Sequence, residues 1–247
     1  MIATIARKEL TVMFTSPLAW TLLALMQLVL TWVFLGRLDA FLEMQSQLIQ
    51  IANPPGVTEI IIAPVFSLAA IVLLMVMPLL TMRLLAEERR NRTLVLLFSA
   101  PVSVADIIIG KFLSLIIFVT IMTTLLIVLS LTLLAGGMLD FGLLLSNALG
   151  LLFIAACFGS LGLYISSLTA HPAVAAVGAL GLLLGLWVLD IVASNGDNMV
   201  RNFSLLKHYE NFNRGIIDTF SLSYFVLFIA TFLILTIHQL DGERLRG

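Results

Sequence analysis

Charge is scarce in this chain. Of its 247 residues only 11% are charged, whereas 61% are hydrophobic and the mean hydropathy is +1.13. An ordinary soluble domain has roughly 45–50% apolar residues and about 25% charged ones, so this composition excludes that class. We therefore predict an all-α polytopic membrane protein, because helices satisfy their own backbone hydrogen bonds inside a bilayer.

Cysteine is nearly absent, and nucleotide-binding motifs are missing altogether. The single Cys157 lies in an apolar run, which excludes an internal disulfide and a multi-cysteine metal site. No G-x-x-x-x-G-K-[ST] run occurs, so we expect the chain to hydrolyse no nucleotide by itself. We predict no catalytic residue, metal site or cofactor in this chain, and no nucleic-acid partner.

Ionisable residues are also rare inside the apolar runs. Ion-coupled carriers usually keep such residues at mid-membrane. Here only Asp190 lies inside a run, near its outer end, where it either has an interfacial role or lines a substrate path. The runs therefore suit helix packing and movement, and the energy source is expected to be external.

Six apolar runs are long enough to cross a bilayer of roughly 30 Å. They cover residues 17–36, 60–81, 112–135, 143–167, 173–193 and 222–237. Ser16 and Pro17 are typical of a helix N-cap and first helical residue, and they mark the start of the first run. The connections are too short for a separate soluble module, so residues 1–247 are predicted to form one transmembrane domain.

The basic residues predict the orientation, because Lys and Arg are enriched on the cytoplasmic side. With a cytoplasmic N-terminus, nine of the 13 basic residues fall on the inner side. The four on the outer side are Arg37, Arg201, Lys207 and Arg214. We therefore predict that both termini and the 82–112 stretch are cytoplasmic.

Residues 82–112 are the only stretch that is rich in charge. Its charged part contains Glu87, Glu88, Arg89, Arg90 and Arg92, with Glu88 and Arg92 at a favourable i, i+4 spacing. Residues Leu94, Leu97 and Phe98 follow at the spacing of one helical face. This pattern predicts a short cytoplasmic helix between the second and third runs, suited to receiving another protein.

Clear stop and start signals follow this short helix. Pro101 is expected to end it, and Ser103 with Asp106 forms a capping-box pattern ahead of the next helix.

Two further segments have amphipathic patterns. Met1–Thr15 contains Arg7, Lys8 and Glu9 among apolar residues, which predicts a helix on the membrane surface. Ahead of the last run, the apolar residues of 203–218 recur at helical spacing, which favours an interfacial or re-entrant helix over a plain solvated loop. These residues are Phe203, Leu206, Tyr209, Phe212 and Ile216.

Several motifs, taken together and in order, resemble the permease subunits of type-2 ABC exporters, with the closest similarity to the gliding-motility-associated (GldF-like) branch. The motifs are Arg7–Leu10, Phe14–Trp20, Pro78–Arg90, Pro101, Ile109–Phe112, and Ser204–Asp218 followed by Tyr224 and Phe225. The resemblance extends over the whole chain.

The resemblance implies a set of partners in a bacterial inner membrane. The charged helix would be a coupling helix that docks in a separate ABC ATPase subunit, present in two copies, which binds ATP and Mg. A second permease, identical or different, would complete the translocation path, and an accessory protein with an outer-side domain is a further candidate partner. The implied coupling residues are Glu87, Glu88, Arg89, Arg90, Arg92, Thr93, Leu94, Leu97, Phe98 and Pro101. The implied outer-cap residues are Phe203, Leu206, His208, Tyr209, Phe212, Arg214 and Asp218.

Three alternatives remain open at the level of sequence. The charged run could be only a topology signal. The chain could be a membrane anchor that passes ATP-driven motion to an outer-surface partner without transport. Glu87 and Glu88 also match the glutamate pair of intramembrane prenyl-protein-type proteases, but the Phe-x-x-x-His and His-x-x-x-Asn/Asp elements of those enzymes are missing.

Overall fold

The computed structural model describes residues 1–48, 56–91, 93, 102–135, 139–193 and 204–244, and every regular element in these ranges is helical. Five helices are long and apolar enough to cross a membrane, and α8 adds a shorter apolar helix. This confirms the prediction of an all-α polytopic membrane protein. The elements are α1 (Ile2–Thr15), α2 (Pro17–Leu48), η1 (Thr58–Ile62), α3 (Ala63–Met82), η2 (Arg83–Glu87), α4 (Glu88–Arg90), α6 (Val104–Leu131), η3 (Thr132–Ala135), α7 (Phe141–Leu168), α8 (Pro172–Ala193), α10 (Leu205–Asn213) and α11 (Thr219–Arg244).

Helix starts follow the polar caps in the sequence. The Ser16 Oγ accepts a hydrogen bond from the Leu18 N–H at 3.4 Å, and α2 begins at Pro17. At the start of α6 the Ser103 Oγ accepts from the Asp106 N–H at 3.1 Å and donates to the Asp106 carboxylate at 2.7 Å. Both starts agree with the capping patterns, because a cap satisfies backbone N–H groups that have no partner within the helix.

Several helices extend beyond the apolar runs. Helix α2 continues past residue 36 to Leu48, and α11 continues past residue 237 to Arg244. Helix α6 begins at Val104, as the Ser103 cap predicted, ahead of the apolar run that starts at residue 112. Hydropathy detects only the apolar part of a helix, whereas the helix itself continues until a cap or a turn ends it.

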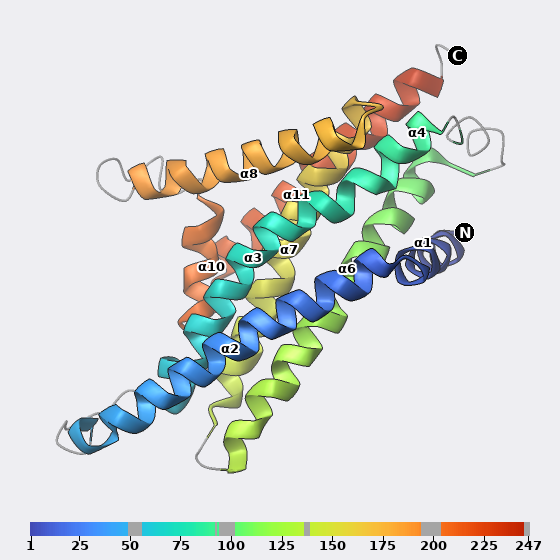
Figure 1. The fold of residues 1–247 in the computed structure, drawn as a ribbon. Helices are drawn as coiled ribbons and strands as arrows, with labels where there is room; N and C mark the ends of the chain where they lie inside the picture. Colours follow the sequence, from blue (N-terminus) through green and yellow to red (C-terminus); the bar gives the residue numbers. More distant parts are fainter. Residues whose placement is uncertain (49–55, 92, 94–101, 136–138, 194–203, 245–247) are drawn as a thin grey trace.

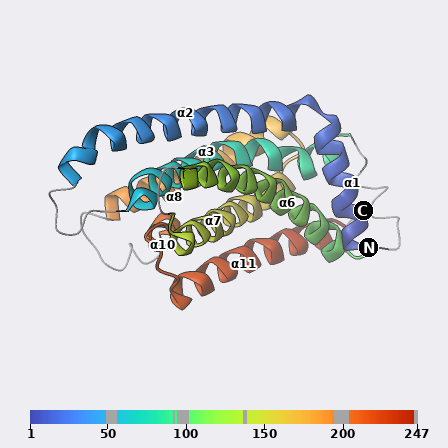
Figure 2. The ribbon, with the colours of Figure 1, turned by 90° about the horizontal axis from the view of Figure 1, so that it is seen from below.

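Helix α7 lies at the centre of the bundle, where it packs against α3, α6, α8, α10 and α11 (Figure 2). In the most apolar window of both α3 and α7, 61% of the residues are buried, compared with 28% for α2 and 17% for α11. Helices α3 and α7 therefore form the core of the bundle, and α2 and α11 lie at its periphery.

The two ends of the bundle differ in what they contain. Both termini, α1 and α4 lie at one end, and α10 lies toward the other (Figure 1). Helix α1 packs against α6 and makes a bend with α2 (Figure 2). We call the first the charged end and the second the α10 end.

Candidate functional site

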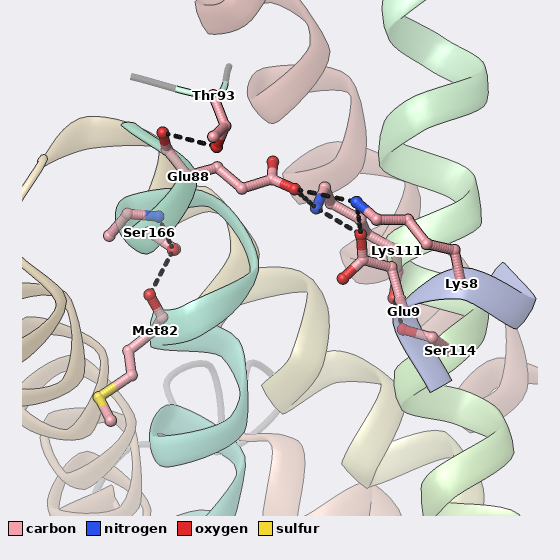
Figure 3. A network of polar contacts seen from close by, with 9 residues as sticks. Lys8, Glu9, Met82, Glu88, Thr93, Lys111, Ser114 and Ser166 are labelled. Carbon is pink, nitrogen blue, oxygen red and sulfur yellow. Dashed lines mark hydrogen bonds and ion pairs between the residues drawn. The ribbon is translucent and has the colours of Figure 1, made fainter. Parts of the chain in front are cut away.

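Four charged side chains from three elements meet at the charged end (Figure 3). Lys111 on α6 places its Nζ 3.0 Å from Glu9 Oε1 on α1 and 2.7 Å from Glu88 Oε1 on α4. The Nζ of Lys8 lies 3.3 Å from Glu9 Oε1 and 3.7 Å from Glu88 Oε1. We call these four residues the ion network. It links the N-terminal helix and the charged stretch to the start of α6.

The ion network is buried on one side and open on the other. The exposed fraction of the side chain is 1% for Lys111, 8% for Glu9 and 16% for Glu88, but 55% for Lys8. A buried ammonium needs charged partners to offset its lost hydration, and two carboxylates provide them here. Lys8 brings the sum of the four charges to zero. Burial by itself would lower the pKa of Lys8, but the charges of Glu9 and Glu88 outweigh this effect and raise that pKa.

The same charged stretch is attached to two more helices. Arg89 forms an ion pair with Glu243 of α11. On the π-helical turn η2, the Ala86 N–H donates to Ser166 Oγ of α7 at 3.0 Å, and this hydroxyl lies 3.4 Å from the Met82 carbonyl, to which it donates (Figure 3). The end of the α3–η2–α4 helix is thus held by α1, α6, α7 and α11. A force applied to this segment has direct contacts through which it can reach four helices.

The coupling residues implied by the sequence fall into two groups in the structure. Glu87, Arg90 and Thr93 are exposed, whereas Glu88 and Arg89 are partly buried and form ion pairs within the chain. The Thr93 hydroxyl donates to the Glu88 carbonyl at 3.2 Å. The remaining residues of the set, Arg92, Leu94, Leu97, Phe98 and Pro101, lie outside the described residues.

Sequence reasoning did not assign the partners of Glu88 and Arg89. Lys111, Glu9 and Glu243 were not among the implied coupling residues, although they bind two members of that set. The sequence did contain one signal, at Lys111, which follows three isoleucines and a glycine and precedes a long apolar run. A lysine in such surroundings needs a carboxylate partner, but the sequence does not say which one.

At the α10 end, the outer-cap residues form a short helix that packs against the bundle. The Tyr209 hydroxyl donates to the Phe66 carbonyl on α3 at 2.8 Å, and the Ser146 hydroxyl on α7 donates to the Phe212 carbonyl at 2.7 Å. Gly150 allows this contact, since a Cβ there would lie 2.6 Å from the Phe212 Cβ. The apolar face of α10 therefore packs on α3 and α7. That this helix is interfacial or re-entrant stays a prediction.

The start and end of α10 are fixed by local hydrogen bonds. The Ser204 Oγ accepts from the Lys207 N–H at 3.2 Å. At the C-terminus, Gly215 has a φ of 81°, its N–H donates to the Phe212 carbonyl, and the Ile216 N–H donates to the Asn211 carbonyl. This is the Schellman arrangement, which favours glycine because its φ is positive.

The other outer-cap residues have different surroundings. His208 is buried, with its Nδ1 3.0 Å from Ser221 Oγ and its ring centroid 4.5 Å from that of Tyr224. Leu206 is half-buried, and Arg214 and Asp218 are exposed. Phe203 lies outside the described residues, as does the side chain of Asp190, whose backbone belongs to α8.

A family model described as "ABC-2 family transporter protein" matches residues 3–239, which is nearly the whole chain. No curated protein matches the sequence. The matched range includes all four residues of the ion network and α10, so both ends of the bundle fall within the family domain. The chain belongs to the ABC-2 family of transporter proteins and is a membrane-spanning permease component of an ABC transporter.

Proposed function

We propose that this chain is the permease subunit of an export-type ABC transporter of the gliding-motility-associated branch, and that it is driven through its charged end. Permeases of this family normally work with a separate ABC ATPase subunit. Two ATPase copies would bind ATP and Mg, and a second permease would complete the translocation path. The complex would reside in a bacterial inner membrane, with both termini of this chain in the cytoplasm.

The observation that supports this proposal is the attachment of the charged stretch to four other helices. Glu88 binds Lys8 of α1 and Lys111 of α6, Arg89 binds Glu243 of α11, and Ala86 donates to Ser166 of α7. A surface that only set the topology would need none of these contacts. An ATPase that moves this segment would displace α1, α6, α7 and α11 together with α3.

The exposed charges next to these attachments suit the first contact with a partner. Glu87 and Arg90 are exposed to solvent, whereas Glu88 and Arg89 are partly buried. Interfacial charges of this kind set orientation and association rate more than affinity. Apolar anchors supply most of the affinity, and the Leu94, Leu97 and Phe98 pattern provides them.

The coupling role is tested by co-purification of the ATPase subunit with Leu97→Asp. Placing a carboxylate in an apolar contact should abolish the complex, because it leaves a charge buried without a partner. Leu96→Asp is the matched control, since the predicted helix would carry residue 96 on the side opposite the apolar face. If both variants still bind the ATPase as wild type does, the charged end is not the coupling surface.

The topology is tested with single cysteines in a Cys157→Ala background. Ser46 and Asn198 are predicted to be outside and Ser103 inside, so an impermeant thiol reagent should label the first two in intact cells. Cys157, which is buried against α11 with its Sγ 3.8 Å from the Phe225 carbonyl, is the one cysteine of the sequence, so its replacement leaves the introduced cysteine as the single thiol. Labelling of the Ser103 variant alone would contradict the predicted orientation and indicate the opposite one.

A further inference from the structure

A cavity of about 370 Å³ lies at the charged end, between α1, α2 and the α3–η2–α4 helix. This volume is within the range of small-molecule sites, roughly 300–1,000 Å³. One wall is apolar and includes Val12, Met13, Leu80 and Leu84. The cavity therefore combines an apolar surface with charged groups, which favours an amphiphilic ligand.

The charges that line the cavity are of both signs. Lys8, Glu9 and Glu88 are compensated within the ion network by Lys111. This leaves Arg83 and Glu87, one cation and one carboxylate, both exposed on η2.

In the described part of the chain no ion pair joins Arg83 to Glu87, although they are four residues apart. The π-helical turn explains this, because its wider turn moves residues i and i+4 out of the stacked position of an α-helix.

The Arg83 guanidinium and the carboxylates in the cavity lining are hydrogen-bonding groups of opposite charge. The Arg83 guanidinium donates to Ser16 Oγ at 3.3 Å and has further N–H groups, which favour a phosphate. The second carboxylate oxygen of Glu88 is buried and has no hydrogen-bond partner among the described residues. A buried acceptor of this kind is costly unless a donor reaches it. Glu87, in the same lining, is the exposed carboxylate that an ammonium group in the cavity can reach.

The position of the cavity indicates a ligand from the membrane. It lies where α1, an amphipathic helix, bends into the apolar α2. Trp20, which is 60% exposed, lies one residue beyond the lining residue Ala19 and donates from its indole N–H to the Phe14 carbonyl at 2.8 Å. Exposed tryptophans are typical of the membrane–water interface, where lipid headgroups lie.

We propose that this cavity binds a phospholipid whose headgroup carries a primary ammonium. The phosphate contacts Arg83 and Ser16, the ammonium donates to the exposed carboxylate of Glu87, and the start of an acyl chain contacts the apolar wall. The ligand joins α1 to the charged stretch. This assignment is independent of the coupling role, because lipid binding is measured without an ATPase.

The test is native mass spectrometry of the full chain, purified in detergent and exposed to equal amounts of phosphatidylethanolamine, phosphatidylcholine and phosphatidylglycerol. Phosphatidylethanolamine should be retained about tenfold more than the other two, the size of one charge-assisted hydrogen bond. Phosphatidylcholine has a quaternary ammonium that cannot donate, and phosphatidylglycerol has no ammonium. Equal retention of the three lipids would overturn the proposal.

Matched variants locate the lipid. Glu87→Gln and Arg83→Gln should each reduce the retention of phosphatidylethanolamine about tenfold, and Arg83→Lys should keep most of it. Arg37→Gln and Glu43→Gln, at the far part of α2, are the controls and should retain it like wild type. Unchanged melting temperatures would show that the variants are folded. Retention unaffected by Glu87→Gln and Arg83→Gln, or displacement of the lipid by inorganic phosphate alone, would overturn the proposal.

Discussion

The two ends of the bundle are held by different forces. At the charged end, Lys111 and its two carboxylates join α1, α4 and α6 through ion pairs. At the α10 end, Tyr209 and Phe212 join α10 to α3 and α7 through neutral hydrogen bonds and aromatic packing. The Arg214 guanidinium, at the C-cap of α10, lies 4.0 Å from the Glu210 carboxylate, and both residues are exposed.

This difference indicates which end can respond to a partner. Ion pairs depend on salt, on pH and on charges that a partner brings, whereas packed aromatic side chains depend mainly on shape. The charged end is therefore suited to receive a signal. The α10 end is suited to keep its shape while the helices move. Four substitutions test this comparison, in order of decreasing expected effect.

The largest loss is expected for Lys111→Met. Removing the ammonium leaves the buried carboxylates of Glu9 and Glu88 with the largely exposed Lys8 as the remaining cation of the ion network, which should cost about 3–5 kcal/mol in the free energy of unfolding. Thermal and urea unfolding in detergent would measure the loss. The double variant Lys111→Met with Glu9→Gln should recover part of it. A loss no larger than that of Lys8→Met would contradict the role of burial, since Lys8 is largely exposed.

The α10 end should be sensitive to volume. Gly150→Ala places a Cβ 2.6 Å from the Phe212 Cβ, so α10 has to shift, at about 1–3 kcal/mol. Gly181→Ala on α8 is the control, because no atom lies within 4 Å of a Cβ there. Thermal unfolding should separate the two. Equal melting temperatures would mean that α10 is loosely attached.

A smaller effect is expected for Tyr209→Phe. The variant keeps the ring and loses the hydrogen bond to the Phe66 carbonyl, which is worth about 1 kcal/mol. Burial raises the pKa of Tyr209, so the hydroxyl stays protonated and keeps donating at physiological pH. Tyr164→Phe serves as the comparison for ring packing against Phe232. If neither Tyr209→Phe nor Tyr164→Phe changed the free energy of unfolding, the hydrogen bond would contribute nothing and α10 would be held by packing alone.

The smallest effect concerns Lys8 and high pH. Its pKa is raised in the folded state, so its contribution is complete below the ordinary lysine pKa of about 10.4 and is lost as the pH rises through the folded-state value. The difference in melting temperature between wild type and Lys8→Met should therefore shrink between about pH 8 and about pH 11. If the difference in melting temperature grew over this pH range, the pKa of Lys8 would be lowered by folding, not raised.

Local chemistry made much of the fold predictable. The composition established a helical membrane protein, and Ser16, Pro17, Ser103 and Asp106 marked where α2 and α6 begin. The spacing of Leu206, Tyr209 and Phe212 also predicted the helix α10. These predictions succeed because capping and helical periodicity depend on neighbours within a few residues.

The tertiary partners of α10 and of the charged residues could not be predicted in the same way. The sequence indicated a helix with an apolar face at α10, but only the tertiary structure placed that face against α3 and α7.

Within the charged stretch, the sequence offered Glu88 only a local partner, Arg92, and did not show which of the four charges from Glu87 to Arg90 are buried. The fold turned Glu88 toward Lys111 and Arg89 toward Glu243, which are 23 and 154 positions away. Hydropathy and spacing thus determined the helices and their capped ends. Only the packing of distant helices decided which charges are buried as pairs, because the cost of burying a charge depends on what the fold brings beside it.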